Sequence, residues 1–193
     1  MLKKVIELFY SNTPNGKKIS IMLEEINFDY KIKEINLSKG EQFNSDFRKI
    51  SPLSKIPVII DHKNKITFFQ SGAILIYLAE LSKKFYDIND RNLINQWLMT
   101  QMSDIGPMLG QHHQFHHYNP GKSKFGEERY FNIAKRLYKD LDERLSISDF
   151  LAGENYSIAD IATFPWIARH SWHDVGLKNF KHLAKWYKKI PFD

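Results

Sequence analysis

The sequence predicts a two-part fold, in which an α/β unit with the element order β-α-β-α-β-β-α is followed by an all-helical unit. Short apolar runs alternate with segments of helical periodicity up to residue 82. A polar segment follows, and beyond it apolar residues recur only at three- and four-residue spacing, without a convincing strand pattern. We therefore expect domains at residues 1–82 and 88–193, both of ordinary domain size.

The first unit opens with an apolar run over residues 5–10, beginning at Val5, that predicts a buried strand. The Pro- and Gly-containing turn after it leads into a helix over 15–26, whose apolar residues recur at helical spacing. Alternation over 30–37 predicts the second strand. The remaining elements are a short helix near 46–50, strands at 58–61 and 66–69, and a helix running from Ser71, as its N-cap, through Leu81.

In the second unit, the apolar spacing predicts helices over 91–117, over 126–147, from residue 158, and over 179–190. Gly106-Pro107 lies inside the first of these and is expected to kink it, because proline removes a helical hydrogen bond. Ser157-Ile158-Ala159-Asp160 fits a capping box at the start of the third helix.

Composition narrows the chemistry. The chain has 193 residues and no cysteine, so disulfides, thiolate metal sites and a protein thiol nucleophile are excluded, whereas thiol chemistry with a cofactor's sulfur is not. The net charge of +6 is dispersed, without the concentrated basic patch that nucleic-acid binding needs. No segment is apolar enough to span a membrane, and the N-terminus lacks a signal-peptide cleavage site, so we expect a cytoplasmic protein without membrane or nucleic-acid partners.

Three motifs occur in a telling order: Ser54-Lys55-Ile56-Pro57-Val58, Phe69-Gln70-Ser71-Gly72-Ala73-Ile74, and the capping box. Together they resemble the cytosolic glutathione transferases, whose first domain has a thioredoxin-like fold. Further segments resemble the bacterial nu class, which is associated with glutathione-dependent disulfide reduction: Thr13-Pro14-Asn15-Gly16, Gly40-Glu41-Gln42-Phe43, Gly106-Pro107-Met108-Leu109-Gly110-Gln111 and Glu128-Arg129-Tyr130. The resemblance implies glutathione as co-substrate and a homodimer.

The resemblance implies that the Ile56-Pro57 bond is cis and that the backbone of Ile56 pairs with glutathione like an extra strand. Gln70 and Ser71 precede a helix, whose N-terminus favours anions, so they are expected to hold the γ-glutamyl carboxylate. The nu class often has Glu where this chain has Gln70.

Thr13 and Asn15 lie where the first strand hands over to the first helix. A sulfur atom placed there would meet a hydroxyl donor and the positive end of a helix, both of which favour thiolate over thiol. We therefore interpret Thr13 and Asn15 as the catalytic pair. Tyr10 and Ser11 remain alternatives, since some transferase classes use a tyrosine or serine near this turn.

The resemblance also assigns glutathione contacts to Gln42, Lys55 and Arg129, which would hold the glycyl end or a carboxylate. The alternative for Arg129 is a solvated helix charge.

The residues interpreted as lining the second-substrate cleft are His112, His113, Phe115 and His116. Pairs of histidines four residues apart lie on one helical face, as a metal site would need, but no acidic or thiol ligand accompanies them, so we expect no metal.

The resulting hypothesis is a glutathione-dependent enzyme that activates the glutathione thiolate. Its main expected reaction is reduction of small disulfides, with weaker conjugation of electrophiles or peroxide reduction. Two alternatives are a non-catalytic glutathione-binding protein and an interaction module of the same fold.

Overall fold

The computed structural model describes residues 6–190 of the chain, so Val5, predicted to begin the first strand, lies outside the described part. The chain divides into two compact units, residues 1–86 and 87–193, each with its own internal contacts. Each unit is described by itself.

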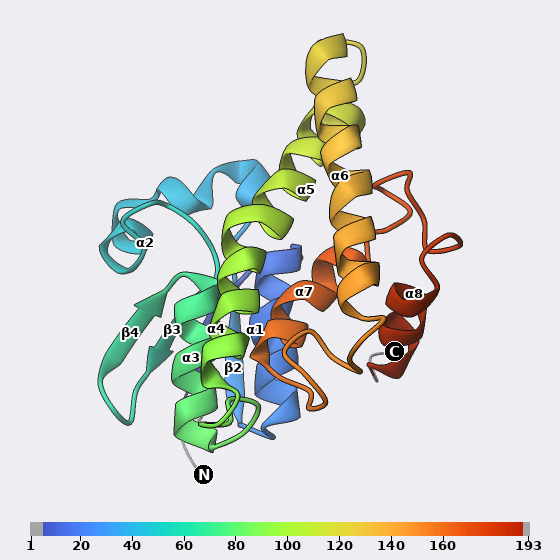
Figure 1. Cartoon of the computed structure of the whole chain (residues 1–193). Coiled ribbons are helices and arrows are strands. Elements are labelled where there is room, and N and C mark those ends of the chain that lie inside the picture. The colour runs from blue at the N-terminus through green and yellow to red at the C-terminus, as the bar shows by residue number, and fades with distance from the viewer. Residues whose placement is uncertain (1–5, 191–193) are drawn as a thin grey trace. The chain divides into compact units, whose positions relative to one another are not determined.

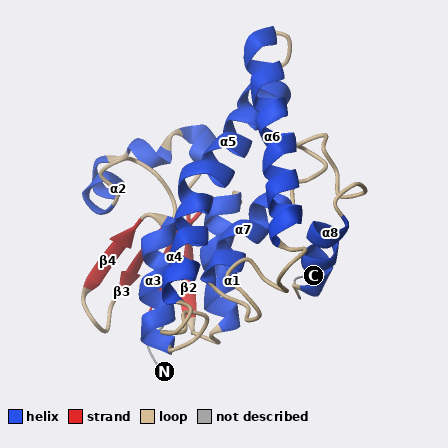
Figure 2. Ribbon diagram, in the orientation of Figure 1, coloured by secondary structure: helices blue, strands red, loops and turns tan. Residues whose placement is uncertain are grey.

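The first unit is built on a four-stranded mixed sheet, shown as red arrows in Figure 2. Its strands lie in the order β2-β1-β3-β4, with β1 parallel to β2 and antiparallel to β3, while β3 and β4 form a hairpin. The predicted element order β-α-β-α-β-β-α is confirmed. The strands are β1 (Ile6–Tyr10), β2 (Tyr30–Glu34), β3 (Val58–Asp61) and β4 (Ile66–Phe69).

Three α-helices accompany this sheet: α1 (Pro14–Glu25), α2 (Ser45–Ile50) and α3 (Ser71–Ser82). Successive residues of a strand point to opposite faces, so the buried side chains of Leu8 and Phe9 serve two different packing layers. The Phe9 ring lies 6.0 Å from that of Phe47, which places α2 on the Phe9 face. Helices α1 and α3 pack against each other, and α1 also contacts β1.

The second strand is shorter than its predicted range of 30–37, because β2 ends at Glu34. The Ile35 amide still donates to the Tyr10 carbonyl at 2.7 Å. The Asn36 side chain then accepts from the Lys39 amide and caps a 3-10 turn, η1 (Leu37–Lys39), which is followed by a second such turn, η2 (Glu41–Phe43). A local side-chain cap therefore ends the strand where apolar alternation alone would continue it.

The second unit contains five α-helices in its described part and no strand element between residues 87 and 190. They are α4 (Arg91–Thr100), α5 (Gly106–His112), α6 (Lys124–Arg144), α7 (Ile158–Ile167) and α8 (Lys181–Lys189). Figure 1 shows α5 and α6 side by side, in agreement with their extensive contacts. None of the helices between residues 6 and 190 has both the length and the apolar character needed to cross a membrane.

The single helix predicted over 91–117 is interrupted twice by π-helical segments, η3 (Gln101–Ile105) and η4 (His113–Tyr118). The first ends directly before Gly106 and Pro107, where the missing proline N–H breaks the regular hydrogen-bond ladder. The perturbation expected at Gly106-Pro107 is thus a widened turn preceding the proline.

Helix α7 lies in the core of the second unit, with all ten of its residues buried. The predicted capping box at its start is confirmed: the Ser157 hydroxyl accepts from a first-turn amide, and the Asp160 carboxylate accepts from the Ser157 N–H at 3.0 Å. Asp160 also accepts from the Leu151 amide and from the indole N–H of Trp186 on α8, both at 2.9 Å. One buried carboxylate therefore joins a loop and two helices.

Candidate functional site

The turn between β1 and α1 is organised by Thr13. Its backbone is extended, its hydroxyl oxygen accepts from the Gly16 amide at 3.1 Å, and Pro14 occupies the first helical position. A hydroxyl can accept and donate at once, and among the described residues no acceptor takes the Thr13 proton. The cap interaction thus fixes the oxygen while leaving the proton available to a ligand at the positive end of α1.

Six predicted site residues meet in one hollow of the first unit, with a volume of about 60 Å³. This volume suits one or two waters or a carboxylate, not a whole tripeptide, so a larger ligand would extend beyond it. The hollow is lined by Asn15, Ser51, Leu53, Lys55, Ile56, Pro57, Phe69, Gln70 and Ser71. It therefore combines the start of α1, the loop before β3 and the start of α3.

The loop before β3 is held by Ser51, a buried residue that the sequence analysis did not select. Its hydroxyl donates to the Lys55 carbonyl at 2.7 Å and accepts from the Lys55 amide at 3.0 Å. The Ile56-Pro57 bond is cis, as predicted. Neither the N–H nor the C=O of Ile56 hydrogen-bonds to another described residue, so this peptide edge can pair with an extended ligand.

The start of α3 differs from the prediction that Ser71 is its N-cap. The cap is Gln70, whose backbone has φ 72° and ψ 114° and whose side chain makes no capping bond, while Ser71 is the first helical residue. The left-handed φ of Gln70 turns the chain sharply into the helix, which moves the cap one residue earlier. Ser71 still lies in the hollow, at the helix end that favours an anion.

Directly behind Ser71 lies a residue that the sequence analysis missed. Lys18, on α1, is only 1% exposed, and its ammonium nitrogen lies 3.4 Å from the Ser71 hydroxyl oxygen. Burial lowers the pKa of Lys18 to about 7. A usable signal was present, because Lys18 shares a helical face with the core residue Met22, four positions later.

The two alternatives to Thr13 lie outside this hollow. Tyr10 is the last residue of β1, and burial, together with the charge of Glu34, raises the pKa of its phenol, so it stays protonated at neutral pH. Ser11 uses its carbonyl to accept from the Thr13 amide at 2.7 Å, which shapes the turn.

Gln42 does not line the hollow either. Its amide nitrogen is 3.5 Å from the Leu37 carbonyl, and its buried side-chain oxygen has no hydrogen-bond partner among the described residues. Arg129 belongs to the second unit and lines an open hollow of about 410 Å³ on α6. The residues of that hollow are Phe125, Glu128, Arg129, Asn132, Ile133 and Arg136. The glutathione contacts assigned to Gln42 and Arg129 remain predictions.

The histidine-rich stretch forms an aromatic cluster within the second unit. His112 and His113 are 0% and 4% exposed, and burial lowers the pKa of both, that of His113 to about 4. His116 is half-buried and faces the Asp174 carboxylate at 2.5 Å. Phe115 stacks on Tyr130 with ring centroids 5.3 Å apart. That these residues line a second-substrate cleft remains a prediction.

Between residues 6 and 190, no group of three or more His, Asp or Glu side chains is arranged to hold a metal ion.

Comparison with known proteins finds the family models for the glutathione S-transferase N-terminal domain over residues 5–80 and C-terminal domain over 112–191. The disulfide-bond oxidoreductase YfcG of Escherichia coli is 42% identical, over 96% of this chain and 90% of YfcG. A Burkholderia graminis glutathione transferase, solved with two glutathione molecules per subunit, matches with a TM-score of 0.91 and 35% identity, over 96% of this chain and 83% of its own.

A glutathione transferase from Pseudomonas putida, solved with one glutathione disulfide per subunit, matches with a TM-score of 0.89 and 37% identity, over 97% of this chain and 87% of its own. These similarities extend over both units and agree with the thioredoxin-like topology and helical second unit described above. The chain belongs to the glutathione transferase family.

Proposed function

We propose that this protein binds glutathione in the hollow between the starts of α1 and α3 and uses its thiolate to reduce small disulfides. The observation that carries the proposal is the Thr13–Asn15 turn, where a hydroxyl proton and a helix N-terminus face a site built for a peptide-like anion. The names of the relatives, one a disulfide-bond oxidoreductase and others solved with glutathione or its disulfide, support this assignment.

In this proposal, the γ-glutamyl carboxylate lies at Ser71 and Gln70, and the cysteinyl unit pairs with the backbone of Ile56. This arrangement brings the sulfur to Thr13 and Asn15. A free thiol has a pKa of about 8.5, and each unit of depression corresponds to about 1.4 kcal/mol of preferential thiolate stabilisation. Two units, or about 2.8 kcal/mol, from the Thr13 hydroxyl and the helix end leave bound glutathione mostly ionised at neutral pH.

The reaction then needs no protein sulfur, in keeping with a chain that has no cysteine. The bound thiolate attacks one sulfur of the disulfide, forming a mixed disulfide and releasing one thiolate, which takes a proton from water. A second glutathione thiolate attacks the mixed disulfide and releases the second thiol and oxidised glutathione. Two glutathiones thus supply the two electrons, and the protein supplies position and electrostatic stabilisation.

Glutathione-dependent reduction of 2-hydroxyethyl disulfide, coupled to glutathione reductase, tests the proposal. We expect turnover by the intact protein and a drop of at least about tenfold in kcat/KM for Asn15→Ala, equivalent to about 1.4 kcal/mol. The matched control is Asn12→Ala, the same substitution at an exposed position of the same turn, which should retain full activity.

A lack of turnover by the intact protein, with glutathione still bound, would replace this proposal with the non-catalytic ligand-binding function. Absence of both turnover and binding would reject the glutathione site. Equal activity of Asn15→Ala and Asn12→Ala would reject the role given to the first turn.

We also propose that the protein acts as a homodimer, as the family resemblance implies. Light scattering coupled to size-exclusion chromatography should give about twice the chain mass of 22.8 kDa.

A further inference from the structure

Lys18 is a buried cation at the floor of the candidate site. Its side chain is 1% exposed, whereas the neighbouring Lys17 is exposed to solvent. The Lys18 ammonium lies 3.4 Å from the Ser71 hydroxyl oxygen, and Ser71 lines the hollow proposed to take the γ-glutamyl carboxylate. A positive charge therefore lies one side chain behind the place of an incoming negative charge.

Burial of this ammonium is unfavourable in the absence of a ligand. Desolvation lowers the pKa of Lys18 from its usual 10.5 to about 7, so its charge is only partly present at neutral pH. The other ionisable side chains on α1, and on β1 and α3, which pack against it in this unit, are Glu24, Glu25, Glu7, Tyr10, Tyr77 and Glu80.

Several of these groups have partners or surroundings that explain them without Lys18. Glu7 faces His62 at 3.3 Å, Glu24 accepts from the Tyr30 hydroxyl at 2.7 Å, and Glu80 is exposed. A structural ion pair with these carboxylates therefore does not account for a lysine at this buried position, whereas an anionic ligand beyond Ser71 would.

We infer that Lys18 is a positioning residue for the γ-glutamyl carboxylate of glutathione, acting through the Ser71 hydroxyl. An ammonium has only protons to offer, so its approach to the Ser71 oxygen biases the hydroxyl proton to point away from Lys18. Ser71 then presents a donor to the carboxylate, and the carboxylate in turn favours the charged state of Lys18. This inference rests on the proposed glutathione site.

The coupling has a measurable consequence. If the ligand's carboxylate stabilises the charged ammonium, binding at pH 7 must draw a proton from the buffer. A group that is half protonated before binding and almost fully protonated afterwards takes up about 0.5 proton per site. A lysine with a purely structural role would take up none.

The experiment is calorimetric titration of the intact protein with S-methylglutathione at pH 7, in two buffers with different ionisation enthalpies. S-methylglutathione keeps the γ-glutamyl carboxylate but has no thiol, so ionisation of the ligand sulfur cannot contribute. We expect uptake of about 0.5 proton by the intact protein and by Lys17→Met, which is the matched control. Lys18→Met should bind at least about tenfold more weakly and take up no proton.

Binding by the intact protein without proton uptake would overturn the role of Lys18 while leaving the proposed function in place. Unchanged affinity in Lys18→Met would do the same. No binding of S-methylglutathione by the intact protein would overturn the glutathione site itself, and the inference with it. Because proton uptake is measured on the intact protein, the decision does not depend on whether Lys18→Met folds.

Discussion

Replacing Asp160 with asparagine tests how strongly one buried carboxylate holds the second unit together. Asp160 is 0% exposed. One of its oxygens accepts from the Leu151 amide and the Trp186 indole, both at 2.9 Å, and the other accepts from the amide and hydroxyl of Ser157, both at 3.0 Å. Burial raises the pKa of this carboxyl, although the hydrogen bonds it accepts act in the opposite direction.

The cost of Asp160→Asn follows from these contacts. The asparagine oxygen can still accept from Leu151 and Trp186, but two bonds to a charged acceptor become bonds to a neutral one, at about 0.5–1 kcal/mol each. The new NH₂ group meets the Ser157 amide, so a buried N–H loses its acceptor, at about 1–3 kcal/mol. We expect a loss of about 3 kcal/mol, which corresponds to a fall in Tm of roughly 6–12 °C for a chain of this size.

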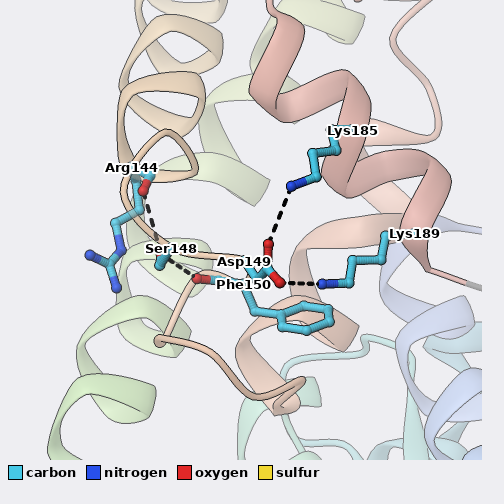
Figure 3. Close-up of polar contacts among 6 residues, drawn as sticks. All are labelled: Arg144, Ser148, Asp149, Phe150, Lys185 and Lys189. Carbon is cyan, nitrogen blue, oxygen red and sulfur yellow. Dashed lines mark hydrogen bonds and ion pairs between the residues drawn. The ribbon is translucent and has the colours of Figure 1, made fainter.

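Asp149→Asn is the matched control, since it makes the same chemical change in the same unit. Figure 3 shows Asp149 between Lys185 and Lys189, with oxygen–nitrogen distances of 3.5 and 2.6 Å, in a partly exposed setting. Exposed ion pairs contribute little, so calorimetry or thermal circular dichroism should show no measurable change in Tm. Equal shifts for Asp149→Asn and Asp160→Asn would refute the reasoning from buried hydrogen bonds.

Three further variants test other features. The folded protein keeps His113 neutral, with its pKa lowered to about 4, so below pH about 6.5 the unfolded chain binds a proton that the folded one does not; urea unfolding should show up to about 3 kcal/mol lost between pH 6.5 and 4, and less of that loss in His113→Leu. Gln70→Gly should raise the free energy of unfolding by about 1 kcal/mol by relieving a φ of 72°, while its KM for glutathione rises; unchanged stability would argue against strain. In Gly16→Ala, the new Cβ would lie 2.3 Å from the Ser11 carbonyl oxygen, so we expect at least about 2 kcal/mol of destabilisation and reduced turnover, whereas Gly110→Ala, with 3.4 Å contacts, should be neutral or stabilising.

Much of the fold could be predicted from apolar periodicity, because each strand and helix buries one face in a regular repeat. The hairpin at 58–61 and 66–69 agrees residue for residue with β3 and β4. Periodicity did not predict the π-helical segments, since a widened turn adds one residue and leaves the apolar spacing of the flanking turns almost unchanged. It also could not place the cap of α3, which depends on the backbone angles of Gln70.

The candidate site was predictable where a local motif fixes local geometry. The Thr13 cap and the cis bond before Pro57 are of this kind. Ser51 and Phe69 were missed because their place in the hollow depends on how the loop before β3 folds back toward α3. That arrangement arises from contacts between segments far apart in the sequence, which spacing along the chain does not encode.

Lys17 and Lys18 show what the three-dimensional structure adds to composition. The two residues are chemically identical neighbours on α1, yet one is exposed and the other is 1% exposed. A helical rotation of about 100° per residue separates their side chains, so Lys18 joins the face of Met22 while Lys17 does not. A lysine on a core face without a nearby carboxylate to account for it is costly unless something else uses its charge. That cost is why we connect Lys18 with an anionic ligand beyond Ser71 rather than with stability.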